Sequence, residues 1–232
     1  MHTYQERRVL IEDNQHPQNL NNIPSGISYV SISSNKGEVG YGTKLFMSNG
    51  SFEKLIEGRI KDGQTLDGYG TMFYNIEKTT YYQGNWRDGL KHGTGTLVCI
   101  TCDQSYTYIG DWQNDKMNGF GKIIYTGIGY YEGDIKNNKY EGSGKFVFDT
   151  GKVFIGRYSN NERVYGTMTK SNGETYVGSW RDNQEWIGKL CLPAKGNCDQ
   201  TEIQYENGKT RDGTNWVALK DNSRYRNLDY YC

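Results

Sequence analysis

The sequence predicts an all-β fold, an elongated antiparallel sheet of tandem β-hairpins. Glycine accounts for 30 of the 232 residues and proline for only 3. Aromatic residues reach 14% in a chain that is only 34% hydrophobic, a composition that fits neither a disordered chain nor an ordinary helical or α/β globule. A short motif also recurs every 22 to 26 residues, which is typical of a repeat architecture.

The recurring motif places a large residue, a glycine and a second large residue at alternate positions. A second glycine, such as Gly95 or Gly144, follows each motif glycine after 10 to 12 residues. Six coordinated copies are too regular for chance, so we expect the motif glycines to be structural. They are Gly58, Gly84, Gly110, Gly133, Gly156 and Gly178.

Each repeat is predicted to form one hairpin. In the first strand, Tyr82, Gly84 and Trp86 lie at alternate positions and therefore share one face. The missing side chain of Gly84 leaves a slot between two rings, which we expect a ring of the neighbouring hairpin to fill. A turn rich in Asn, Asp and Gly then reverses the chain, and a second strand follows. A hairpin this short cannot bury a face alone, so stacking on neighbouring repeats must stabilise it.

Three segments are predicted along the chain. Residues 1–28 form an extended N-terminal segment, and residues 29–188 form the repeat array, which is clear from about residue 56. The first, atypical unit of the array is expected to act as a capping rung. Residues 189–232 form a C-terminal cap or extension, with a short helix expected at residues 217–225.

The motif resembles the MORN repeat, whose pattern is approximately Tyr-x-Gly-x-Trp-x-x-Gly-x-x-His-Gly-x-Gly. Residues 82–95 match nearly every position, residues 108–121 have Asn118 for the histidine, and residues 131–144 have Ile135 for the tryptophan. The resemblance covers about residues 56–188 and implies a single-layer ribbon of hairpins with an aromatic-lined groove. It implies no single activity, because similar arrays serve as radial-spoke and cytoskeletal scaffolds, as membrane-junction proteins and as appendages to enzymes.

Nine aromatic residues of the repeats are candidates for binding a partner protein. A single-layer ribbon has no second sheet to cover it, so we expect part of their ring surface to line an exposed groove. Rigid aromatic side chains suit such a site, although purely internal packing and other ligands are alternatives. The nine residues are Tyr82, Trp86, Tyr108, Trp112, Tyr131, Phe154, Tyr158, Tyr176 and Trp180.

No catalytic residue, metal site or cofactor is predicted. Of the three histidines, His92 lies in a repeat turn, where we expect a structural hydrogen bond. Cys99 and Cys102 have the spacing of zinc ligands but lack a second pair, so we expect free thiols in a longer loop, with zinc as the alternative. We therefore expect a protein that is not an enzyme.

The expected function is a non-enzymatic scaffold or adaptor in a larger, cytoskeletal or ciliary (axonemal) assembly in the cytoplasm. The 27 basic residues equal the 27 acidic ones, so no net field attracts nucleic acid. Five scattered cysteines favour a reducing compartment. Open sheet edges are compatible with a homodimer. The alternative is a peripheral membrane or phosphoinositide adaptor that uses basic residues near the turns, although acids interleave with them: Lys61, Arg87, Lys91, Lys116, Lys122, Lys136, Lys139 and Lys145.

Overall fold

The computed structural model describes residues 7–10, 27–33, 39–48, 51–61, 65–100, 102–192, 201–206 and 209–210. Side chains are described for residues 40–46, 51–61, 66–100, 102–186 and 188. Within these ranges the chain forms β-strands and turns and no helix, so the predicted all-β class is confirmed. The helix expected at residues 217–225 lies outside the described residues.

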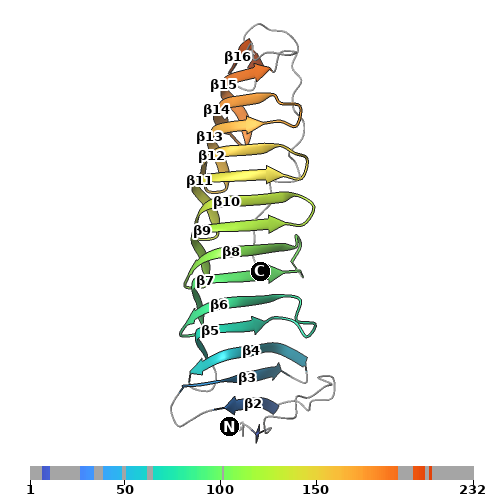
Figure 1. Cartoon of the computed structure of the whole chain (residues 1–232), viewed down its shortest axis with the longest axis vertical. Helices are drawn as coiled ribbons and strands as arrows, with labels where there is room; N and C mark the ends of the chain where they lie inside the picture. The colour runs from blue at the N-terminus through green and yellow to red at the C-terminus, as the bar shows by residue number, and fades with distance from the viewer. Residues whose placement is uncertain are drawn as a thin grey trace, which may run out of the picture. The chain divides into compact units, whose positions relative to one another are not determined.

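The chain divides into two compact units, residues 1–116 and 117–232. In the first unit each strand from β2 onward pairs antiparallel with the next, and β1 pairs parallel with β2 (Figure 1). Its strands are β1 (Arg7–Leu10), β2 (Ile27–Ser33), β3 (Val39–Ser48), β4 (Ser51–Lys61), β5 (Thr65–Phe73), β6 (Tyr81–Arg87), β7 (Leu90–Cys99) and β8 (Tyr106–Gln113).

The second unit is built in the same way, with every described neighbouring pair antiparallel. Its strands continue past the last repeat into the C-terminal segment. They are β9 (Lys116–Tyr125), β10 (Gly129–Lys136), β11 (Lys139–Phe148), β12 (Val153–Ser159), β13 (Glu162–Thr169), β14 (Thr175–Arg181), β15 (Gln184–Leu192), β16 (Thr201–Glu206) and β17 (Lys209–Thr210).

Within each unit, glycines face one another across consecutive strands and form a ladder. A side chain at these positions would collide with the neighbouring strand: a Cβ on Gly84 would lie 2.5 Å from the Cα of Gly95, and one on Gly133 would lie 2.5 Å from the Cα of Gly144. The two ladders run Gly42, Gly58, Gly70, Gly84, Gly95, Gly110 and Gly121, Gly133, Gly144, Gly156, Gly166, Gly178, Gly188.

The slot above most glycine pairs is filled by a ring of the same repeat, and the slot above Gly58 and Gly70 is filled by Leu66. A Cβ on Gly144 would lie 2.5 Å from the Cε2 and Oη atoms of Tyr131, which is on the partner strand of the same hairpin. The Tyr131 hydroxyl donates a 2.7 Å hydrogen bond to the carbonyl of Asp134, which holds the ring over the glycines. The expectation that a neighbouring hairpin fills this slot is therefore wrong, because the tyrosine reaches forward along its own strand.

The hairpin turns adopt the left-handed conformation that their composition predicts. In the second unit Asn137 and Asn138 have φ values of 51° and 66°, and Asn160 and Asn161 have values of 50° and 71°. Two successive residues with positive φ form the type I′ turn that matches the twist of a hairpin. The side chain of Asn138 also accepts a 2.8 Å hydrogen bond from the N–H of Met117, so the turn residue ties one hairpin to the preceding strand.

Asn138 supplies both a turn conformation and a side-chain hydrogen bond, so two substitutions at this residue should lower stability by different amounts. Asn138→Gly should lose only the side-chain hydrogen bond and cost about 1 kcal/mol. Asn138→Ala loses the same bond and also places a Cβ at positive φ, which should add about 1 kcal/mol. Urea denaturation of the two variants checks this order. Equal midpoints for both would show that the turn conformation contributes nothing.

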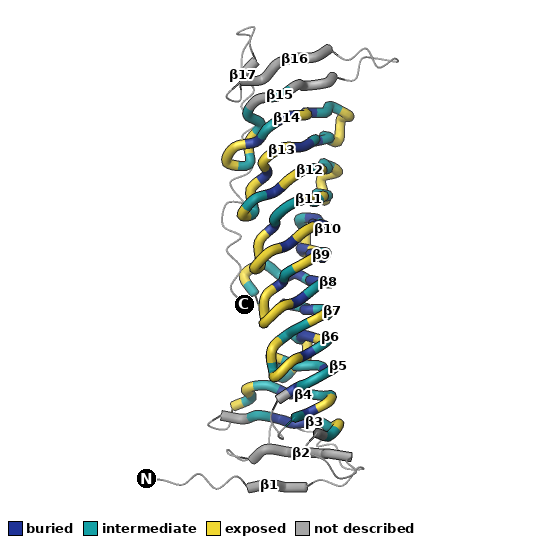
Figure 2. Tube along the Cα trace, turned by 90° about the vertical axis from the view of Figure 1, so that its left-hand side faces the viewer, coloured by how far each residue is buried: buried dark blue, intermediate teal, exposed yellow. Residues whose placement is uncertain are grey.

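The strands bend near the glycine ladder. Register shifts interrupt the pairing between Gly84 and Trp86 and between Gly133 and Ile135, and such bulges increase the bend and twist of a strand. Opposite ends of the strands therefore meet over one face: Lys91, near the start of β7, lies 5.7 Å from the ring of Tyr74, which follows β5. The strand ends of each unit therefore cover its own aromatic face. Buried residues alternate with more exposed ones along strands such as β10 (Figure 2).

Candidate functional site

The nine aromatic residues predicted to line an exposed groove are buried. Their exposed fractions run from 0% for Tyr82, Tyr108, Tyr131, Phe154 and Tyr176 to 9% for Trp180. The expected exposure of ring surface is therefore wrong, and its physical reason is the bend, which brings the strand ends over the rings. A partner that docks on the folded protein must contact other side chains.

The buried rings interlock between repeats. The ring of Tyr82 contacts Trp86 of its own repeat at 4.8 Å and Trp112 of the next repeat at 5.1 Å, both edge-on. The indole N–H of Trp86 donates to the carbonyl of Gly70 at 3.0 Å, and that of Trp112 donates to Gly95 at 3.3 Å. These contacts give the interior a fixed geometry, because Trp86 and Trp112 each combine edge-on ring contacts with a backbone acceptor.

In two of the repeats the second residue of the second strand is a cation that lies against the buried rings. Lys91 places its ammonium 5.1 Å from the ring of Trp112, and Arg163 places its guanidinium 4.5 Å from the ring of Trp180. Burial lowers the pKa of Lys91, an effect that Asp115 at 4.0 Å partly opposes. Burial also lowers the pKa of Arg163. These cations are held by rings inside the sheet and are unavailable to a membrane surface.

The buried tyrosines predict loss of the fold at alkaline pH. Burial, as the largest cause, raises the pKa of each above its ordinary value near 10, so the folded state keeps protons that the unfolded state releases. Stability should be complete below pH 10 and fall as the pH rises further. The lowered pKa values of Lys91 and Arg163 act in the opposite direction, but these are only two groups. The tyrosines are Tyr82, Tyr108, Tyr131 and Tyr158.

Absorbance of tyrosinate and far-ultraviolet circular dichroism, recorded together during an alkaline titration, check this prediction. Tyrosinate should appear in two steps, the first from exposed tyrosines with the fold intact and the second together with loss of the β signal. A single step near pH 10 with an unchanged β signal would show that the rings are accessible.

A set of exposed aromatic side chains lies on the opposite face of the sheet. The residue before the ladder glycine of each second strand points away from the rings. It is an exposed aromatic residue in four places, three of them inside a Gly-x-Gly motif. Sequence reasoning missed these residues, although the signal was present, because a residue next to a ladder glycine that faces the rings must itself face outward. They are Tyr41, Tyr69, Phe120 and Tyr165.

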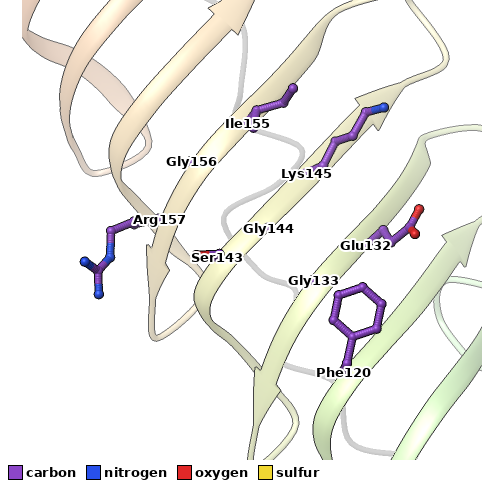
Figure 3. Close-up of a pocket in the computed structure, with 9 residues that line it drawn as sticks. All are labelled: Phe120, Glu132, Gly133, Ser143, Gly144, Lys145, Ile155, Gly156 and Arg157. Atoms are coloured by element: carbon purple, nitrogen blue, oxygen red, sulfur yellow. The ribbon is translucent and has the colours of Figure 1, made fainter.

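A shallow hollow of about 540 Å³ lies on this outer face of the second unit. Its floor is the backbone of Gly133, Gly144 and Gly156, and its apolar walls are Phe120 and Ile155, each 57% exposed (Figure 3). Lys145 and Arg157 lie on opposite sides of it, because they occupy the rows of residues that flank the glycine ladder (Figure 3).

The charged residues near the turns form mixed pairs. Lys61 contacts Asp88 at 2.8 Å and Lys122 contacts Glu132 at 4.0 Å, both exposed. Surface pairs of this kind contribute little to stability, but they interrupt a continuous basic line. Among the side chains that the structure describes, Lys145 and Arg157 form no ion pair. Glu132 also lines the hollow, opposite Lys145 in the sheet, so two cations and one carboxylate leave a net charge of +1 there.

The other candidate residues from the sequence, His92, Cys99 and Cys102, do not line the hollow. The N–H of Gly93 donates a 2.8 Å hydrogen bond to Nδ1 of His92, the structural bond expected in this turn. Cys99 and Cys102 form a disulfide, so the expectation of free thiols is wrong. Within the described ranges, no group of three or more His, Cys, Asp or Glu side chains is arranged to hold a metal ion.

Comparison with known proteins identifies the repeat. The family model described as MORN repeat matches residues 82–101, 108–127 and 131–153. No curated protein matches the chain. Across the described part of the chain, no helix has the length and apolar character needed to cross a membrane. The repeat matches and the sheet of consecutive hairpins agree, and the chain is a MORN-repeat protein.

Proposed function

We propose that this MORN-repeat protein is a non-enzymatic scaffold or adaptor that binds a partner protein on the outer face of its second unit. The observation that carries the proposal is the hollow between Phe120 and Ile155, where two large apolar side chains are mostly exposed over a glycine floor. Exposed aromatic and aliphatic anchors on a preformed surface bind protein partners at low entropic cost.

The assembly that we propose for this scaffold is cytoskeletal or ciliary, within the cytoplasm. This assignment rests on the resemblance of the repeats to those of cytoskeletal and radial-spoke scaffolds and on the neutral net charge. Lys145 and Arg157 beside the hollow favour a partner segment that carries acidic residues next to an apolar one.

Recovery of partners with the tagged protein from its own cells tests the proposal. Phe120→Ala combined with Ile155→Ala should reduce recovery of the main partner about tenfold or more, because exposed anchors dominate interface energetics. Tyr69→Ala is the matched control, since Tyr69 holds the same repeat position as Phe120 in the first unit and is equally exposed. An unchanged set of partners in the double variant would overturn this docking surface.

The second candidate function is a peripheral membrane or phosphoinositide adaptor, which the unbalanced charge of Lys145 and Arg157 favours. In this case the protein should sediment with vesicles that contain phosphatidylinositol phosphates, and Lys145→Ala with Arg157→Ala should abolish this binding. Absence of sedimentation at low salt would remove the candidate.

A further inference from the structure

The connection between β7 and β8 contains a Cys-x-x-Cys disulfide with unequal accessibility. Cys99 ends β7, pairs with Tyr106 in the sheet and is 2% exposed, whereas Cys102 lies in the connecting loop and is partly exposed. We propose that this pair is a thiol–disulfide exchange site, reduced by a dithiol through Cys102, and that its redox state controls the order of two adjacent loops.

The disulfide loop is hydrogen-bonded to the loop between β5 and β6. The N–H of Ile100 donates to Oγ1 of Thr80 at 3.2 Å, and the hydroxyl of Ser105 donates to the carbonyl of Ile100 at 3.0 Å. Thr80 is itself held, since its N–H donates to Oδ1 of Asn75 at 2.9 Å. Ile100, which lies between the two cysteines, is therefore hydrogen-bonded through its backbone to both loops.

The unequal burial of the two sulfur atoms fixes the direction of the exchange. A thiolate of the reductant attacks Sγ of Cys102, the bond between the cysteines breaks, and Cys99 leaves as a thiolate that takes a proton from water. The second thiolate of the reductant then attacks its own sulfur in the mixed disulfide and releases Cys102. Two protein thiols form and the dithiol becomes a disulfide, so atoms and electrons balance.

Reduction should loosen the loops and leave the hairpins intact. A bridge between residues 99 and 102 closes a very short loop, which removes little entropy from the unfolded chain. The hairpins on either side are stabilised by interlocked rings that the reaction does not touch. The switch is therefore local, confined to residues 75–80 and 100–105.

Reduction of the full chain with dithiothreitol tests the proposal. Peptide mapping should show Cys99 and Cys102 blocked before reduction and open to alkylation after it. Amide exchange at residues 75–80 and 100–105 should then rise about tenfold or more, with β6 and β8 unchanged. Cys99→Ser, which leaves Cys102 alone, should form a mixed disulfide with oxidised glutathione, with release of reduced glutathione, much faster than Cys102→Ser, which leaves only the buried cysteine.

Four results would overturn the proposal. Alkylation of both cysteines in the oxidised protein would show that the disulfide does not form. Faster exchange throughout the first unit would identify a structural bridge, and unchanged exchange in both loops after reduction would show that the bond controls nothing. Equal adduct rates for the two single variants would contradict the proposed direction of attack.

Discussion

Gly144→Ala should destabilise the second unit by about 3 kcal/mol, as a methyl group forced into a packed interior does. The new Cβ would lie 2.5 Å from Cε2 and Oη of Tyr131. Tyr131 cannot move away, because its ring is fully buried, stacks on Tyr140 at 3.8 Å and is held by its hydrogen bond to Asp134. Urea denaturation followed by circular dichroism measures the loss.

Gly127→Ala is the control for this substitution. Gly127 has φ of 72° and no atom lies within 4 Å of the position of an added Cβ, so alanine there introduces backbone strain of about 1 kcal/mol and no collision. A cost at Gly144 that does not exceed the cost at Gly127 would show that the tyrosine ring does not occupy the glycine slot.

Trp112→Ala should cost about 3–5 kcal/mol, the range for deleting a buried aromatic side chain. The indole is 4% exposed, contacts the rings of Tyr82 and Tyr108 edge-on and donates to the carbonyl of Gly95. Removal therefore leaves a cavity between two repeats and takes away the indole donor of the part-buried Gly95 carbonyl. Thermal and urea unfolding of the full chain measure this effect.

Trp112→Phe separates packing from hydrogen bonding. Phenylalanine keeps an aromatic ring but lacks the indole donor, so its cost should be well below that of alanine. A folded Trp112→Ala protein of unchanged stability that had lost a partner would show that this ring is a binding residue and not part of the interior.

The facing glycines and the turn conformations of the repeat were predictable, because each depends on residues that are close in sequence. The spacing of Gly84 and Gly133 places glycine opposite glycine, and Asn137 and Asn138 adopt the positive φ values that such turns require. The rings of Tyr82 and Trp112 interlock between hairpins as their positions on the strands suggest.

The accessible face was predicted incorrectly, because alternation along a strand assumes that the strand is straight. The bulge next to the ladder bends it, and the first glycine of Gly-x-Gly carried this information: Gly93 and Gly142 have φ values of 60° and 77°. Sequence spacing likewise did not decide the state of Cys99 and Cys102, since thiols, zinc ligation and a disulfide share that spacing and only the path of the loop separates them.

Hydroxyl-radical footprinting of tyrosine in the native protein tests the central claim most directly, because it measures the accessibility of individual rings. Tyr69 and Tyr165 on the outer face should be oxidised rapidly, and Tyr82, Tyr108 and Tyr131 should be protected until the protein is unfolded. Equal oxidation of the two sets in the folded state would contradict the account, because the predicted groove rings would then be open to solvent.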